Sequence, residues 1–134
     1  MTSIQEPVFS VVVLIARACL SAVFLVSGIH KALWYTKAIK EFKVAAIPLI
    51  SVTLPLTIAL HIIASLCIFS GVFVSEAALS LALFTLAVTL WVHRFWKHSG
   101  SLRLDLSRVA LVNLGLVGGL LLLAASGPGQ FVFP

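Results

Sequence analysis

Four apolar stretches, each about as long as a bilayer-spanning helix, dominate this chain of 134 residues. They cover about residues 8–29, 48–74, 77–96 and 106–126. A transmembrane helix needs about 20 apolar residues. Only 10% of the residues are charged, against roughly 25% in a soluble domain. We therefore predict an all-α integral membrane protein, an antiparallel four-helix bundle that forms a single domain over residues 1–134.

The segment between the first two stretches, residues 30–47, has a different pattern. At helical spacing its apolar side chains gather on one face and its charged side chains lie elsewhere. The apolar face consists of Tyr35, Ile39, Phe42 and Ala46. We expect a short amphipathic helix in the membrane interface, with Trp34 and Tyr35 as aromatic anchors and Lys31 reaching lipid headgroups. A plain basic loop is the alternative.

The basic side chains other than Arg17 are confined to two regions, one between the first and second apolar stretches and one at or between the ends of the third and fourth. They are Lys31, Lys37, Lys40, Lys43, Arg94, Lys97, Arg103 and Arg108. Because cytoplasmic loops carry an excess of Lys and Arg, we predict that both segments are cytoplasmic and both termini outside, in a bacterial-type cytoplasmic (inner) membrane. The net charge of +5 comes without a basic block or a stacking aromatic motif, so we expect no nucleic-acid partner.

One stripe of the first apolar stretch is unsuited to a lipid-facing surface. Its members follow one another at steps of four, three, four and three residues, which places them on one helix face. They are Arg17, Ser21, Phe24, Gly28 and Lys31. Because a charge in hydrocarbon is costly, we predict that this stripe packs against other helices, with Ser21, Phe24 and Gly28 at the contact. Gly115 and Gly119 are predicted to allow a second close approach.

Arg17 is the one charge far from both predicted interfaces, and no Asp or Glu lies within the four predicted spans. Its acceptors must be helix carbonyls, Asn113, water, or an oxygen of a bound lipid or quinone. A rise of 1.5 Å per residue places His61 at the level of Arg17. We take Arg17, His61, Asn113 and His93 as candidate ligand- or quinone-binding residues. The alternative is that these groups only join the helices.

The four histidines raise the question of a haem site. A bis-His haem b needs two imidazoles at similar depth on facing helices. His61 and His93 differ by about 15 Å in depth, which excludes them as a pair. His30 and His93 remain, and we do not expect haem b there. No Cys/His spacing predicts a metal site, and no nucleophile or phosphate-loop motif is present, so we do not expect an enzyme that acts alone.

The first-span pattern R-x3-S-x2-F-x3-G-x2-K resembles the opening motif of the DoxX family of small four-span membrane proteins. Three further features fit that family: His93 at the end of the third span, Asn113 in the fourth, and the tail Gly127-Pro128-Gly129. The resemblance covers about residues 12–131. One departure is His61, because family members often carry Glu in the second span, so any chemistry of that Glu is lost or altered here.

The resemblance implies a role beside membrane oxidoreductases, since the family takes its name from a subunit of a thiosulfate:quinone oxidoreductase. We therefore expect a membrane subunit or anchor of a quinone-linked oxidoreductase that lines a quinone-access site. Expected partners are membrane lipid and either subunits of a redox complex or further copies of the chain. A small-molecule transporter would need inverted repeats or a midplane acidic site, and neither is visible. A cofactor-free structural or chaperone-like interaction protein is the other rival.

Overall fold

The computed structural model describes residues 5–133. Its elements are α1 (Gln5–Leu33), α2 (Tyr35–Val44), α3 (Ile50–Ser70), α4 (Val74–Trp91), the 3-10 helix η1 (Phe95–Lys97) and α5 (Gly100–Ser126). Four helices are long and apolar enough to span a membrane, and the short α2 lies between the first two. The predicted all-α class, with four antiparallel spans and a short helix between spans one and two, is confirmed. The ends of the predicted domain, residues 1–4 and Pro134, lie outside the described residues.

The second span is shorter than we predicted, for a reason in the backbone. α3 ends at Ser70 rather than near residue 74, because Gly71 adopts the left-handed conformation with φ 90°, which terminates helices. Residues 71–73 therefore form the turn. Glu76 lies in the first turn of α4, where a carboxylate interacts favourably with the helix dipole.

The connection between α4 and α5 also differs from the prediction. The third candidate span runs from Val74 to Lys97 and includes the predicted end near residue 96, but its α-helix, α4, ends at Trp91. α5 begins at Gly100 rather than near residue 106. The intervening chain contains η1, whose short turn reverses the direction. His93 consequently lies in the connection and not on the face of a helix.

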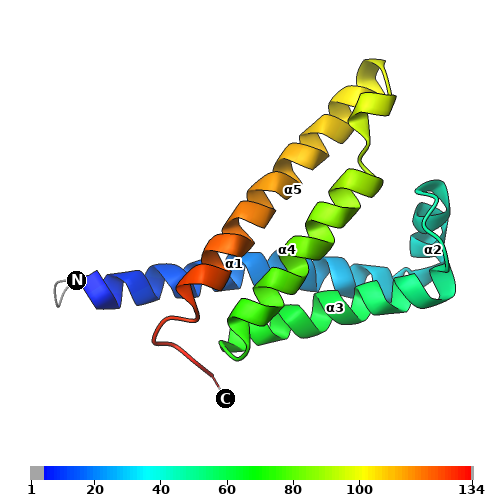
Figure 1. Cartoon of the computed structure of the whole chain (residues 1–134). Helices are drawn as coiled ribbons and strands as arrows, with labels where there is room; N and C mark the ends of the chain where they lie inside the picture. Colours follow the sequence, from blue (N-terminus) through cyan, green and yellow to red (C-terminus); the bar gives the residue numbers. More distant parts are fainter. Residues whose placement is uncertain (1–4, 134) are drawn as a thin grey trace.

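The spans pack as two antiparallel pairs, α1 with α3 and α4 with α5, joined through contacts of α3 with α4. Figure 1 shows that α4 and α5 lean away from α1 and α3 toward the α4–α5 connection, while α2 lies across the end of the α1–α3 pair. The bundle is therefore closed where the α3–α4 turn and the C-terminal tail lie. It opens toward the two basic connections.

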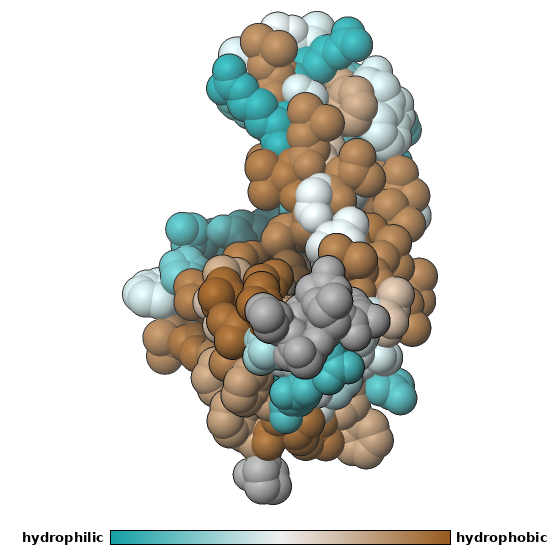
Figure 2. Space-filling model, turned by 90° about the vertical axis from the view of Figure 1, so that its left-hand side faces the viewer, coloured by the Kyte–Doolittle hydropathy of each residue, from teal (hydrophilic) through white to brown (hydrophobic). Residues whose placement is uncertain are grey.

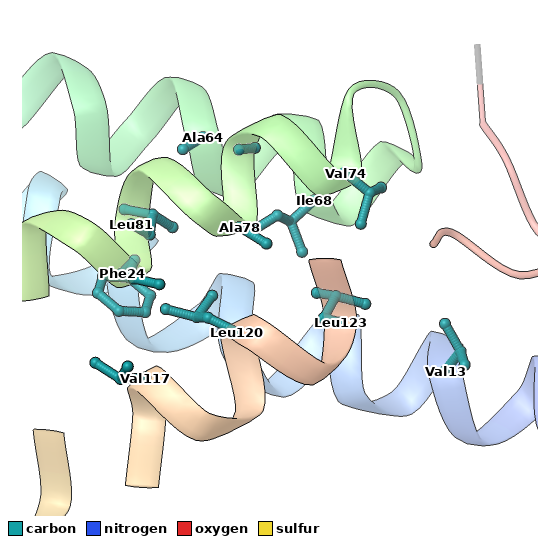
Figure 3. Close-up of a cluster of buried hydrophobic side chains, with 12 residues drawn as sticks. Val13, Phe24, Ala64, Ile68, Val74, Ala78, Leu81, Val117, Leu120 and Leu123 are labelled. Carbon is teal, nitrogen blue, oxygen red and sulfur yellow. The ribbon is translucent and has the colours of Figure 1, made fainter. Parts of the chain in front are cut away.

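The main core fills only the closed half of the bundle (Figure 3). From α4 it takes residues of the first half of the helix, and from α5 residues of the second half. These are Val74, Ala77, Ala78, Leu81, Ala82, Val117, Leu120 and Leu123. The alanines let the helix backbones approach closely. A separate small cluster of Ala38, Phe42 and Leu54 holds α2 against α3.

The surface is strongly apolar along the spans. In Figure 2 the arm formed by α4 and α5 is brown over most of its visible length, and hydrophilic residues gather at its tip. Large side chains such as Leu83, Leu111 and Leu122 are well exposed on these helices. Such a surface suits hydrocarbon, in which backbone polar groups are satisfied inside each helix.

Among the glycines within helices, Gly28 has the closest neighbours, and these neighbours belong to α3. A Cβ at this position would come within 2.9 Å of the His61 Cβ and 3.0 Å of the Ile62 Cγ1. A Cβ at Gly119 would make ordinary contact with Leu20, 3.6 Å away. Gly115 differs from our expectation, because nothing lies within 4 Å of the position of its Cβ. It belongs to the exposed surface of α5 within this chain.

We expect Gly28→Ala to overpack the contact between α1 and α3 and to lower stability by about 1–3 kcal/mol. Gly115→Ala is the matched control, because its methyl group meets no neighbour. The control should be neutral or stabilising by up to about 1 kcal/mol, since Ala replaces Gly within a helix. Thermal unfolding of both variants in the same detergent measures the difference, and equal melting temperatures would contradict this account of the contact.

Candidate functional site

A cavity of about 710 Å³ occupies the open half of the bundle, between the two diverging helix pairs. All four spans, α2 and the chain between α2 and α3 contribute to its wall. Most of the lining is apolar, with a few polar side chains. Three of our four candidate residues, His61, His93 and Asn113, line this cavity, and Arg17 does not.

His61 forms the buried end of the cavity. Only 5% of the residue is exposed, and it sits opposite Gly28, the position in α1 that leaves room for it. The rings of Phe24 and Phe84 meet the imidazole edge-on, with centroids 5.5 and 5.1 Å away. Both ring nitrogens are buried and have no hydrogen-bond partner. Because buried polar groups are almost always paired, this imidazole stands out as an unpaired polar group in the wall of the cavity.

Two threonines lie near this end. Thr85 on α4 is buried, and its Oγ1 has no partner. Thr57 on α3 is also buried, but its hydroxyl donates to the Thr53 carbonyl of its own helix at 2.8 Å. Thr85 is therefore a second buried and unpaired polar group in the cavity wall, whereas the Thr57 hydroxyl is already engaged.

A further polar group joins α4 to α5 along the cavity wall. The Asn113 Nδ2 donates to the Thr89 Oγ1 at 2.9 Å, and Thr89 in turn donates to the Thr85 carbonyl at 2.7 Å. His93 lines the cavity beyond them, and its Nδ1 is buried without a partner. Asn113 thus links the two helices while facing the same space as His61.

Charged groups occur at the exposed end of the cavity. Lys31 on α1 is half-buried, and its Nζ donates to the Ser27 Oγ at 2.6 Å. Glu41 on α2 also lines the cavity, but it forms no ion pair with Lys31. Trp34, which we expected to be an interfacial anchor, is 53% exposed and stacks on His30 at 4.4 Å. Tyr35 is exposed beside it. The cavity therefore has a neutral buried end and a charged exposed end.

Arg17 is fully buried at the opposite, closed end of the bundle. Its Nε donates to the Ile68 carbonyl at 2.8 Å and its Nη2 to the Phe69 carbonyl at 2.5 Å. Its Nη1 donates to the carbonyls of Pro128, at 2.8 Å, and Phe131. The guanidinium thus ties α1 to the last turn of α3 and to the C-terminal tail. We call this arrangement the Arg17 clamp.

Our placement of Arg17 beside His61 and within reach of Asn113 is wrong. Because Gly28 lies against His61, antiparallel packing puts Arg17, three turns earlier on α1, against the end of α3. Helix carbonyls, one of the acceptors we considered, supply two of its hydrogen bonds, and carbonyls of the C-terminal tail, which we did not consider, supply the others. The last carbonyls of a helix lack partners within the helix and carry partial negative charge, so they suit a buried cation.

The absence of a side chain at Gly71 makes room for the Arg17 guanidinium. A Cβ at Gly71 would come within 2.7 Å of the Arg17 Nη2, and the positive φ of Gly71 also favours glycine. The Phe133 N–H donates to the Ser70 carbonyl at 2.6 Å and continues the attachment of the tail. Ser21, expected at the helix contact, is buried but donates to the Arg17 carbonyl of its own helix at 2.6 Å.

Sequence reasoning did not identify two parts of these sites. Phe84 was missed because α4 is apolar on all sides, so the sequence does not show which of its faces points into the bundle. The acceptors of Arg17 were missed because they are main-chain carbonyls. Every residue type has one, so the sequence does not indicate which of them bind Arg17. Gly71 could have served as a signal, because a glycine often ends a helix. The end of α3 at this position supplies two of those carbonyls.

Comparison with known proteins agrees with this architecture. A family model described as DoxX matches residues 12–94. The chain belongs to the DoxX family. No curated protein and no solved structure matches it. The matched part of this DoxX protein includes Arg17, His61 and His93, and it leaves out α5 with Asn113 and the tail that completes the Arg17 clamp.

In this DoxX protein we expect Arg17→Leu to lower stability markedly. The change removes the donors of four carbonyls, and a buried group left unpaired costs about 1–3 kcal/mol. Arg17→Lys should be intermediate, because an ammonium cannot reproduce the planar fork of a guanidinium. The control is Arg108→Leu, which removes only an exposed ion pair with Asp105 at 3.8 Å. A melting temperature of Arg17→Leu equal to that of the wild type would refute the Arg17 clamp.

Proposed function

We propose that this DoxX-family protein is a membrane subunit of a quinone-linked oxidoreductase and that its cavity holds the quinone ring. The observation that carries the proposal is His61, a buried imidazole with two unpaired nitrogens at the end of a largely apolar cavity. The family name supports the oxidoreductase association, since DoxX is linked to thiosulfate:quinone oxidoreductase.

The residues of the cavity fit a quinone. Small-molecule sites typically measure about 300–1,000 Å³, are mostly apolar and contain a few placed polar groups, which matches a volume of about 710 Å³. A quinone ring presents two carbonyl acceptors and an apolar face. The His61 imidazole and the Thr85 hydroxyl are unpaired groups that can donate to such carbonyls, and the Phe24 and Phe84 rings bound the same space.

A bound quinone would supply two-electron chemistry coupled to the uptake of two protons. The chain's own part is to hold and orient the ring. His61 donates from one ring nitrogen, Thr85 donates from its hydroxyl, and the apolar walls exclude water. Asn113 keeps α5 attached to α4 through Thr89 and so fixes the far wall. Arg17 has no direct part, because it lies outside the cavity.

The proposal assigns electron transfer to a partner subunit and gives this chain the role of quinone holder and anchor. Charged groups at the exposed end of the cavity, Lys31 and Glu41, lie where a partner at the membrane surface could reach them. The rival without a cofactor explains the buried threonines and Asn113 as helix contacts. It does not explain why both nitrogens of the buried His61 lack a hydrogen-bond partner, so we favour the quinone site.

We expect His61→Leu to weaken quinone binding while the chain stays folded. Loss of a buried donor costs about 1–3 kcal/mol, or roughly fivefold to 140-fold in affinity. Ser65→Ala is the matched control, because Ser65 is also buried and unpaired on α3 but does not line the cavity. Titration of the purified variants with a short-chain quinone measures the effect. Equal affinities of His61→Leu and wild type would overturn the proposed site.

We also propose that the protein lies in a bacterial cytoplasmic membrane with both termini outside, on the strength of its two basic connections. The test uses a chain in which Cys19 and Cys67 are replaced by Ala. A cysteine at Ser99 should then be protected from an impermeant thiol reagent in intact cells, and one at Gln130 should react. Labelling of Ser99→Cys with protection of Gln130→Cys would reverse the orientation.

A further inference from the structure

The helix α2 has two faces with different partners. Its buried face, Ala38 and Phe42, packs on Leu54 of α3, and Ile39 adds to this contact. Figure 1 shows α2 lying across the end of the α1–α3 pair. A helix attached in this way turns its opposite face away from the bundle, at the level where the spans end.

That outward face carries Lys37 and Lys40, and Lys43 lies at its edge. All three are exposed, and none forms an ion pair in the part of the chain that the structure describes. The acidic residue of α2, Glu41, lies on the flank that lines the cavity. Three exposed lysines therefore lie on α2, and its one carboxylate, Glu41, forms no ion pair with them.

The other basic end of the molecule is arranged differently. The Arg94 guanidinium stacks over the Trp91 ring, 4.7 Å from its centroid, and Arg108 lies 3.8 Å from Asp105. Two of the four cations at this end therefore have partners within the described chain, whereas the exposed Lys97 and Arg103 form no ion pair there. On α2, by contrast, all three lysines are exposed and unpaired among the described residues and lie on one short helix.

We propose that the lysine face of α2 is a binding surface for anionic phospholipid headgroups. An amphipathic helix in the interface binds through its apolar face and through lysines that meet anionic headgroups. Here Leu54 takes the place of lipid under the apolar face, so the lysines are held at the membrane surface in a fixed position. The exposed Trp34 at the start of α2 anchors the same corner. This surface is separate from the quinone cavity and does not depend on it.

The test places a fluorescent reporter next to α2. Trp91→Phe and Trp96→Phe leave Trp34 as the one tryptophan of the three. The full-length protein in neutral detergent is titrated with brominated phosphatidylglycerol or brominated phosphatidylcholine, and quenching of Trp34 reports binding. We expect phosphatidylglycerol to bind at least tenfold more tightly, and the difference to shrink in high salt, because screening weakens contacts between exposed charges.

Charge-neutral variants locate the site. A lysine near an anionic surface contributes about fivefold in affinity, so combining Lys37→Gln, Lys40→Gln and Lys43→Gln should weaken binding of phosphatidylglycerol by about a hundredfold. The three corresponding changes to Arg should retain binding, which separates loss of charge from loss of fold. Lys97→Gln is the control at the other basic end. Unchanged affinity of the glutamine triple variant, or an equal effect of Lys40→Gln and Lys97→Gln, would overturn the proposal.

Discussion

The structure depends on a buried cation whose hydrogen bonds are accepted by main-chain carbonyls. Arg17 lies inside an apolar span and is fully buried, and its nitrogens donate to carbonyls of α3 and of the C-terminal tail. Removing a charge from water is costly unless its hydrogen bonds are replaced. The last turn of α3 supplies acceptors that already carry partial negative charge. The cation in turn joins segments that are far apart in the sequence, α1, the end of α3 and the tail.

This clamp explains why the bundle is asymmetric. At the closed end, small residues of α4 and the leucines of α5 pack on α1 and α3, and the Arg17 clamp holds the tail across them. Among the described residues no equivalent set of hydrogen bonds joins the two pairs at the basic end, where α4 and α5 diverge from α1 and α3 (Figure 1). The cavity results from that divergence. Its polar side chains lie on different helices, so their arrangement depends on how the two helix pairs pack against each other.

The cavity and the lysine face of α2 both belong to the open end, and α2 takes part in each. Its Phe42 and Glu41 contribute to the cavity wall, while its lysines point away from the bundle. In the two proposals, a hydrophobic ligand such as a quinone would occupy the cavity, and an anionic headgroup would meet the lysines of α2. The two proposals use different chemistry, hydrogen-bond donation by a buried imidazole and attraction between exposed charges.

The sequence by itself determined the four spans, the short helix between the first two, the stripe that contains Arg17 and Gly28, and the family. Helical periodicity carries this information, because it states which residues share a face. The tertiary structure alone decided that Arg17 meets the end of α3 and not His61 or Asn113, and that His61, Asn113 and His93 share one cavity. Periodicity does not set the offset of one helix along another. That offset depends on where Gly71 ends α3, on the close approach at Gly28, and on carbonyls of the tail, which any residue type can provide.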